Sequence, residues 1–305
     1  MLKSTFPFES QKIARFQTLI LDWYEVNQRN LPWRHTHDPY AILVSEVMLQ
    51  QTQVERVLKY WSAWLKRWPN FDSLASTPTA DIIRAWAGLG YNRRAVNLQR
   101  AARFITERDG FAGFKTMASL QTIPGIGPGT AGALMNFVWN IDTAFLEVNI
   151  KRIMQRLAFG PETIVGWAKD NELLAVAHAV LPRGKARIWP HALMDFGALA
   201  CRPNDPLCKN CALGSILPAS RLKHKNTWSI LLKQSKPRFE TTNRYWRGQI
   251  INHLRSVRNG LTDKQLFSRL SDSSNLLQKD RFRALVVALN KDGLLVIKET
   301  LIQLP

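Results

Sequence analysis

The chain has 305 residues and a mass of 34.9 kDa, of which 46% are hydrophobic and 21% charged. These proportions exclude a mainly disordered chain and indicate two or three compact units with hydrophobic cores. Its 42 lysines and arginines exceed the 23 acids, so the formal charge is +19 and the pI is about 10.3. This excess predicts a polyanionic partner, with nucleic acid as the first candidate.

The sequence predicts neither a membrane span nor an export signal. No stretch of about 18 apolar residues occurs, and residues 1–15 mix Lys, Glu, Ser and Pro without an apolar core. We therefore expect a cytoplasmic protein. Cys201, Cys208 and Cys211 fall within eleven residues, a spacing more typical of a metal or cluster site than of a disulfide framework.

Apolar residues recur at three- and four-residue intervals from residue 12 to about residue 200, which predicts many short helices joined by short turns. Residues 218–240 are predicted to be a basic linker, because six Lys or Arg and no acid occur between Arg221 and Arg238. Further basic surface is expected from Arg93, Arg94, Arg100 and Arg103. Helices are predicted at 244–257, 263–270 (capped by Thr262) and 279–290, and a β-hairpin at 294–304, an order typical of a winged-helix unit.

Residues 40–54, YAILVSEVMLQQTQV, predict an apolar helix in which Glu46 is the only charged residue. Partial burial raises the pKa of a carboxyl, so Glu46 could hold a proton near neutral pH and act as a general acid. The structural alternative is that Glu46 caps a backbone group or pairs with an arginine inside the helical bundle. The segment alone does not distinguish the two.

Residues 120–131, LQTIPGIGPGTA, predict a helix end, a glycine-rich turn and the start of a second helix. Gly125 and Gly127 leave backbone amides open to an anion, and the second helix presents its positive end. A DNA phosphate fits such a turn. The alternative is a helix-to-helix turn without a ligand, and the net charge of +19 favours the phosphate.

A second acid, Glu147, precedes a predicted helix that carries Lys151, Arg152 and Arg156. A carboxylate in this position could stabilise positive charge that develops on a sugar. Alternatively, Glu147 and Asn149 cap the helix, which is a common role for such residues.

The motifs SEVMLQQTQ, GLGYNRRA, IPGIGPGTAGA and LEVNIKR, with the three cysteines after them, resemble those of helix-hairpin-helix DNA glycosylases, closest to the MutY-type adenine glycosylases. The resemblance covers about residues 31–217. It implies a mainly α, bilobal core over residues 1–217, with a six-helix lobe at about 34–150 and a second lobe from the N-terminal helix and residues 151–217. Residues 241–305 resemble the small winged-helix-like domain of some actinobacterial members.

The resemblance implies a monomeric, monofunctional glycosylase of base excision repair, associated with the nucleoid. It would flip adenine mispaired with 8-oxoguanine or guanine out of double-stranded DNA and hydrolyse its N-glycosidic bond. Glu46 matches the general acid that protonates adenine N7, and Asn149 matches an asparagine that supports the site. Glu147 replaces an Asp that stabilises the sugar cation. Its extra methylene shifts the carboxylate by about 1.5 Å, and a misplacement of about 1 Å can cost roughly a hundredfold in rate.

The resemblance also implies a set of DNA-binding residues, in which Gln51 and Tyr91 enter the duplex and fill the gap left by the flipped base. The full set is Gln51, Thr52, Tyr91, Gly125, Gly127, Gly129 and Thr130. Bifunctional relatives carry a Lys at the position of Gly129, and its amine attacks the sugar. Because this chain has no Lys there, water is expected to complete the reaction.

The family binds a [4Fe-4S] cluster through Cys-x6-Cys-x2-Cys-x5-Cys, and this chain places Leu217 at the fourth position. Four thiolates usually hold such a cluster. Three outcomes stay open: Cys201, Cys208 and Cys211 hold a cluster with an outside ligand, they hold [3Fe-4S], or they hold nothing. In the last case Leu213, Ile216 and Leu217 would pack in place of the cluster.

Two rival functions also stay open. The departures at Glu147 and Leu217 are compatible with a paralogue that binds mismatches but has weak or no catalysis. Relatives on the same scaffold remove another mispaired base, such as thymine opposite guanine.

Overall fold

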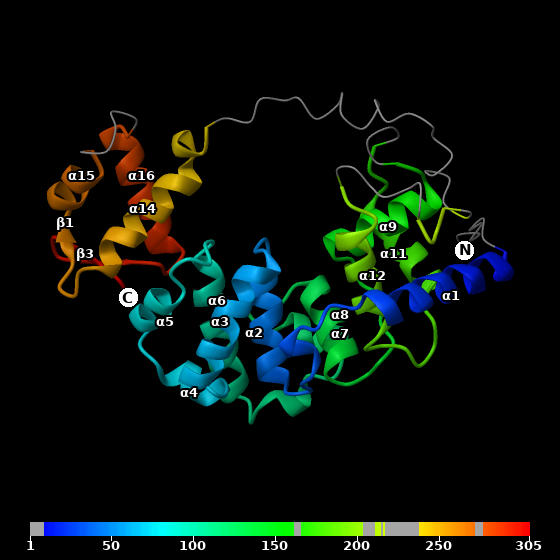
Figure 1. Ribbon diagram of the computed structural model, residues 1–305. Coiled ribbons are helices and arrows are strands. Elements are labelled where there is room, and N and C mark those ends of the chain that lie inside the picture. The colour runs from blue at the N-terminus through cyan, green and yellow to red at the C-terminus, as the bar shows by residue number, and fades with distance from the viewer. Residues whose placement is uncertain (1–8, 162–165, 204–210, 215, 217–237, 272–276) are drawn as a thin grey trace. The chain divides into compact units, whose positions relative to one another are not determined.

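The computed structural model describes residues 9–161, 166–203, 211–214, 216, 238–271 and 277–305 (Figure 1). This part of the chain is mainly helical with one small antiparallel sheet, which confirms the predicted mainly α class. None of the helices described is both long and apolar enough to cross a bilayer. Most of the predicted basic linker, up to residue 237, lies outside the described residues, as do Cys208 and Leu217.

The chain forms two compact units. Unit 1 comprises residues 1–42, 115–121 and 126–234, and unit 2 comprises residues 43–114, 122–125 and 235–305.

In unit 1 the long N-terminal helix, α1 (Ser10–Asn27), packs against α12 (Trp189–Leu199). Helix α1 buries Phe16, Ile20 and Tyr24, which lie four residues apart and so share one face. Phe16 meets Trp189 of α12 edge to face, with ring centres 5.7 Å apart. The other elements of unit 1 are η1 (Pro32–Arg34), α7 (Met117–Gln121), α8 (Pro128–Phe137), α9 (Val148–Ala158) and α11 (Asp170–Ala179).

In unit 2 tryptophans fill the core of the first half. Trp64 packs edge-on against Trp68 and Trp86, with ring centres 4.6 and 5.3 Å away, and Trp61 is also buried. These side chains therefore serve packing, as their helical spacing predicts. The helices are α2 (Pro39–Leu49, which begins in unit 1), α3 (Val54–Arg67), α4 (Phe71–Ser76), α5 (Thr79–Ala85) and α6 (Arg93–Thr106), followed by η2 (Phe111–Gly113).

The C-terminal segment, residues 238–305, contains the three predicted helices and the predicted hairpin. The Thr262 hydroxyl accepts a hydrogen bond from the Gln265 amide (3.3 Å), so it caps the second of these helices as expected. One strand was not predicted: Leu261 pairs with Ile302, giving an antiparallel sheet of order β1-β3-β2. The elements are η5 (Phe239–Thr241), α14 (Asn243–Arg255), β1 (Leu261–Thr262), α15 (Asp263–Ser271), α16 (Lys279–Lys291), β2 (Val296–Lys298) and β3 (Leu301–Gln303).

The C-terminal segment shares a hydrophobic core with the first half of unit 2. Ile83 of α5 and Val96 of α6 belong to the same buried cluster as Trp246 and Ile250 of α14. The Ala80 amide also donates to the carbonyl of the last residue, Pro305, at 3.0 Å. Burial of this apolar surface stabilises the attachment of α14 to α5 and α6.

Candidate functional site

Glu147 lies at the N-terminus of α9 and is held there by Asn149. Its Oε2 accepts a hydrogen bond from the Asn149 amide at 2.8 Å, and the Asn149 side chain donates to both carboxyl oxygens at 3.1 Å. Burial raises the pKa of Glu147, although these hydrogen bonds and the charge of Arg152 oppose the rise. Glu147 thus caps α9, which is the alternative role predicted from the sequence. The hydrogen bonds from Asn149 also orient its carboxyl.

Arg152 and Gly197 in turn fix the position of Asn149. The guanidinium of Arg152 donates to Asn149 Oδ1 at 2.7 Å, to the Gly197 carbonyl at 2.6 Å and to the Cys201 carbonyl at 2.8 Å. A Cβ atom at Gly197 would lie only 2.5 Å from Asn149 Cβ, so α9 and α12 approach closely here. The sequence identified Arg152 only as a cation on the helix and gave no signal for Gly197.

Glu46 lies half-buried on α2, whose neighbouring residues Val44, Val47 and Met48 are buried. This agrees with the apolar helix predicted for the segment. Glu46 belongs to unit 2, whereas Glu147 and Asn149 belong to unit 1. That the two carboxyls flank one nucleotide stays a prediction.

Gln51 and Tyr91 occupy two turns of unit 2 with unusual backbones. Their φ angles are 54° and 47°, a left-handed conformation that costs a non-glycine residue of order 1–3 kcal/mol. The Arg94 side chain joins the two turns through hydrogen bonds of 2.6–3.0 Å to the carbonyls of Val47, Met48, Gln50, Leu89 and Gly90 and to the Thr52 hydroxyl.

Arg94 therefore differs from its expected role as a surface cation. Its exposed fraction is 8%, and burial, with a contribution from the charge of Arg244, lowers its pKa to about 10. It remains charged at neutral pH and stabilises the turns that present Gln51 and Tyr91.

The predicted glycine-rich turn connects α7 with α8. Gly125 has φ 83°, and a Cβ atom there would lie 2.9 Å from Asn97 Cβ, so only glycine fits. Gly127 caps α8, and a Cβ atom at Gly127 would meet nothing within 4 Å. Gly129 and Thr130 lie in the first turn of α8. Phosphate binding at this turn stays a prediction.

The two described cysteines differ in their surroundings. Cys201 is buried and its Sγ accepts a hydrogen bond from Arg156 at 3.3 Å, whereas Cys211 is half-buried. Among the described residues no cluster of three or more His, Cys, Asp or Glu could hold a metal. Because the fourth cluster position is Leu217 in the sequence, the chain does not fit a four-thiolate cluster.

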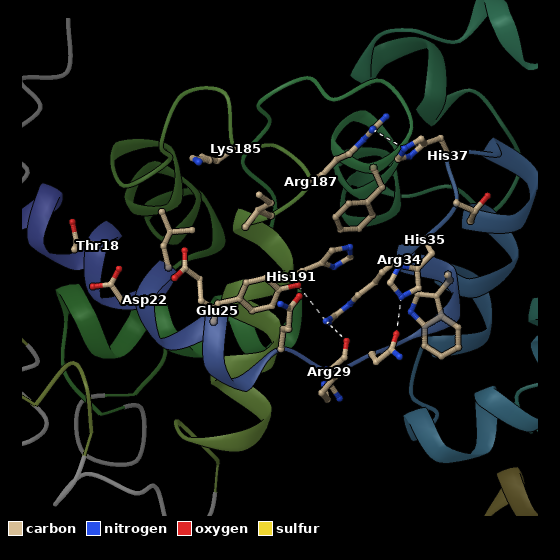
Figure 2. A pocket seen from close by; sticks show the side chains of 18 residues that line it. Thr18, Asp22, Glu25, Arg29, Arg34, His35, His37, Lys185, Arg187 and His191 are labelled. Carbon is tan, nitrogen blue, oxygen red and sulfur yellow. Dashed lines mark hydrogen bonds between the residues drawn. The ribbon is translucent and has the colours of Figure 1, made fainter.

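A cavity of about 830 Å³ lies in unit 1, and Figure 2 shows its lining side chains, including the hydrogen-bonded pair Arg187 and His37. Two of them, Arg29 and Arg34, bind Asp195, with contacts of 2.6 Å from Arg29 and 2.8 Å from Arg34. Asp195 is completely buried. Burial alone would raise its pKa, but the hydrogen bonds and charges of Arg34 and Arg29 outweigh this effect and lower it.

An aromatic surface lines another part of this cavity. The His191 ring stacks on Phe137 with centres 4.1 Å apart, and Trp33 also lines the space. Burial, aided by the nearby charge of Arg34, lowers the pKa of His191 well below 6.5, so its imidazole is neutral at physiological pH. Donors beside aromatic rings suit a flat, polar heterocycle.

Arg29, Arg34 and Asp195 were not predicted from the sequence as site residues. A signal was present, because Asp195 is the only acid in α12, a helix whose other residues are apolar apart from His191. The same pattern identified Glu46.

Comparisons with known proteins agree with this fold. A family model for HhH-GPD superfamily base excision DNA repair proteins matches residues 44–169. The adenine DNA glycosylase of Buchnera aphidicola subsp. Baizongia pistaciae is 34% identical over 232 residues, 76% of this chain and 65% of that protein. That of Mycolicibacterium smegmatis is 33% identical over 248 residues, 81% of this chain and 83% of that protein.

The solved structure of a thermostable thymine-DNA glycosylase superposes with a TM-score of 0.64 at 28% identity, over 69% of this chain and 97% of that one. The chain spans just under two thirds of the Buchnera relative but most of the mycobacterial one. By this similarity the chain belongs to the adenine DNA glycosylase family of the helix-hairpin-helix base excision repair superfamily.

Proposed function

We propose that the protein is a monofunctional DNA glycosylase that releases adenine mispaired with 8-oxoguanine or guanine from double-stranded DNA. The observation that carries the proposal is the half-buried Glu147 carboxyl, oriented by Asn149, in a chain that belongs to the adenine glycosylase family. The net charge of +19 suits a DNA substrate, which would place the protein at the nucleoid.

In the proposed reaction Glu46 donates a proton to adenine N7, so the base can leave with the electrons of the N-glycosidic bond. The sugar then carries positive charge, which the ionised Glu147 stabilises. Water adds to the sugar carbon and loses a proton, which leaves an abasic site and free adenine. Gly129 provides no amine for a competing attack.

We assign the cavity of unit 1 to the extruded base. Its volume of about 830 Å³ accommodates a purine with water. The His191–Phe137 stack offers an apolar surface to the ring, while Arg29 and Arg34 offer donors to polar edges. Asp195 holds both guanidinium groups in place.

The test is release of adenine from duplexes with an A·8-oxoguanine or A·G pair, with protein in excess and detection by mass spectrometry. Substitution Glu46→Gln should abolish release because the amide cannot supply the proton. The matched control Glu107→Gln, at an exposed acid in unit 2, should release adenine at the wild-type rate. No adenine from either wild-type reaction would defeat the proposal.

One observation favours a second candidate, a mismatch-binding protein with little turnover. Both carboxyl oxygens of Glu147 already accept hydrogen bonds from Asn149. The carboxylate is therefore less available to stabilise a sugar cation. Tight mismatch binding without release, unchanged by Glu147→Asp, would support this candidate. A duplex with a G·T pair belongs in the same panel, since the superposed solved structure is a thymine-DNA glycosylase.

A further inference from the structure

A second cavity, of about 1040 Å³, lies in unit 2 and is hereafter called the α14 groove. It is lined by the turns of Gln51 and Tyr91 and by residues along the whole length of α14. Six arginines and one acid line it: Arg56, Arg93, Arg94, Arg244, Arg247, Arg255 and Asp292. A basic groove with aromatic side chains is the composition that binds a nucleic-acid strand.

Arg244, in the first turn of α14, covers the ring of Tyr91. Its Cζ atom lies 3.9 Å from the centre of the Tyr91 ring and 5.7 Å from that of Phe239. A guanidinium stacks on an aromatic face through its planar charge, an arrangement that a lysine ammonium does not reproduce. The contact restrains a tyrosine whose backbone is already in the left-handed region.

Helix α14 is firmly attached to the rest of the groove. Arg255 donates to the Ile83 carbonyl at 3.1 Å and to Asn92 Oδ1 at 2.9 Å, and Trp246 belongs to the shared core. Asp292 pairs with Arg247 at 2.5 Å and with Arg93 at 3.5 Å. Arg93 is still 63% exposed and has donors left for an incoming anion.

We propose that the α14 groove binds one strand of the DNA duplex, with Arg93 contacting a phosphate and Arg244 acting as a positioning residue for Tyr91. The C-terminal segment would then contribute to DNA binding through the α14 residues that line the groove, among them Arg244 and Arg247. Arginine suits the phosphate role because its planar fork matches phosphate oxygens. The inference rests on the proposed function, since DNA is the ligand, and extends it to a segment that the known chemistry does not require.

The experiment measures binding and base unstacking in the full-length protein without base release. A fluorescent duplex carries 2-aminopurine beside an A·G mismatch, so anisotropy reports affinity and 2-aminopurine emission reports entry of Tyr91 into the stack. The variants are Arg244→Ala, Arg244→Lys and Arg93→Ala. Arg269→Ala, at an exposed arginine of α15 that does not line the groove, is the matched control.

Both Arg244 variants should lose most of the 2-aminopurine signal, because neither side chain stacks as a guanidinium does. Arg93→Ala should lower the slope of log affinity against log salt by about 0.9, the value for one phosphate contact. Arg269→Ala should match the wild type in emission, and circular dichroism should confirm that every variant is folded.

Three results would overturn the inference: wild-type emission in Arg244→Ala, full rescue by Arg244→Lys, or equal competition by polyglutamate, which would indicate an acidic protein partner. The results also distinguish a wrong assignment of the groove from a wrong proposed function. If the wild type releases adenine and the Arg244 variants keep the wild-type emission, only the groove proposal is refuted. If the wild type unstacks the duplex but releases no adenine, only the proposed glycosylase activity is refuted.

Discussion

Substitution Gly197→Ala tests whether the contact between α12 and α9 positions the Glu147 carboxyl for its proposed role. The new Cβ atom would lie 2.5 Å from Asn149 Cβ, about 0.9 Å short of the 3.4 Å at which ordinary contact begins. Asn149 must retreat by about this distance, and Glu147, held by Asn149 through two kinds of hydrogen bond, should follow. Since a misplacement of about 1 Å can cost around a hundredfold in rate, we expect the single-turnover rate of adenine release to fall by about that factor.

The stability of this variant should change little by comparison. Overpacking costs about 1–3 kcal/mol, but alanine gains about 0.5–1 kcal/mol over glycine inside a helix. The assay is single-turnover release with urea unfolding measured alongside. Gly113→Ala, where a Cβ atom meets nothing within 4 Å, serves as the control. A rate within threefold of wild type in folded Gly197→Ala would refute the reasoning.

Three further predictions follow from other features. Because burial raises the pKa of Glu147 and its ionised form is needed, the rate of release should fall as the pH falls through a midpoint above the ordinary 4.5; a midpoint at or below 4.5 would contradict this. Arg94→Met should lower the free energy of unfolding by roughly 3–5 kcal/mol in urea titrations, because it leaves buried carbonyls without donors. Arg108→Met, at an exposed arginine, should cost far less, and equal losses would refute the bracing role of Arg94. Leu217→Cys should raise the iron content and the cluster absorbance of anaerobically purified protein, since four thiolates hold a cluster better than three; unchanged iron would argue against a cluster site.

Much of the local structure was predictable because it depends on neighbouring residues. Helical spacing placed the tryptophans of α3 in the core, and Thr262 was identified as a cap from its position before an amphipathic segment. Glu147 was identified both as a candidate stabiliser and as a helix cap, and the cap is present. Such features need only a few consecutive side chains and a backbone conformation.

The features that sequence patterns missed join residues far apart in the chain. Arg94 looked like one more surface cation until its contacts with carbonyls more than forty residues away were visible. Gly197 has no marker in the sequence, because only the approach of α9 demands a glycine there.

The sequence by itself determined the helical class, the order of elements in the C-terminal segment and the acids that could do chemistry, since periodicity, caps and an isolated charge in an apolar helix are local properties. Only the tertiary structure decided that Asp195 holds Arg29 and Arg34, that Asn149 orients Glu147 under the restraint of α12, and that Arg244 covers Tyr91. These contacts depend on how buried surfaces and long side chains meet across the fold, which no pattern in consecutive residues specifies.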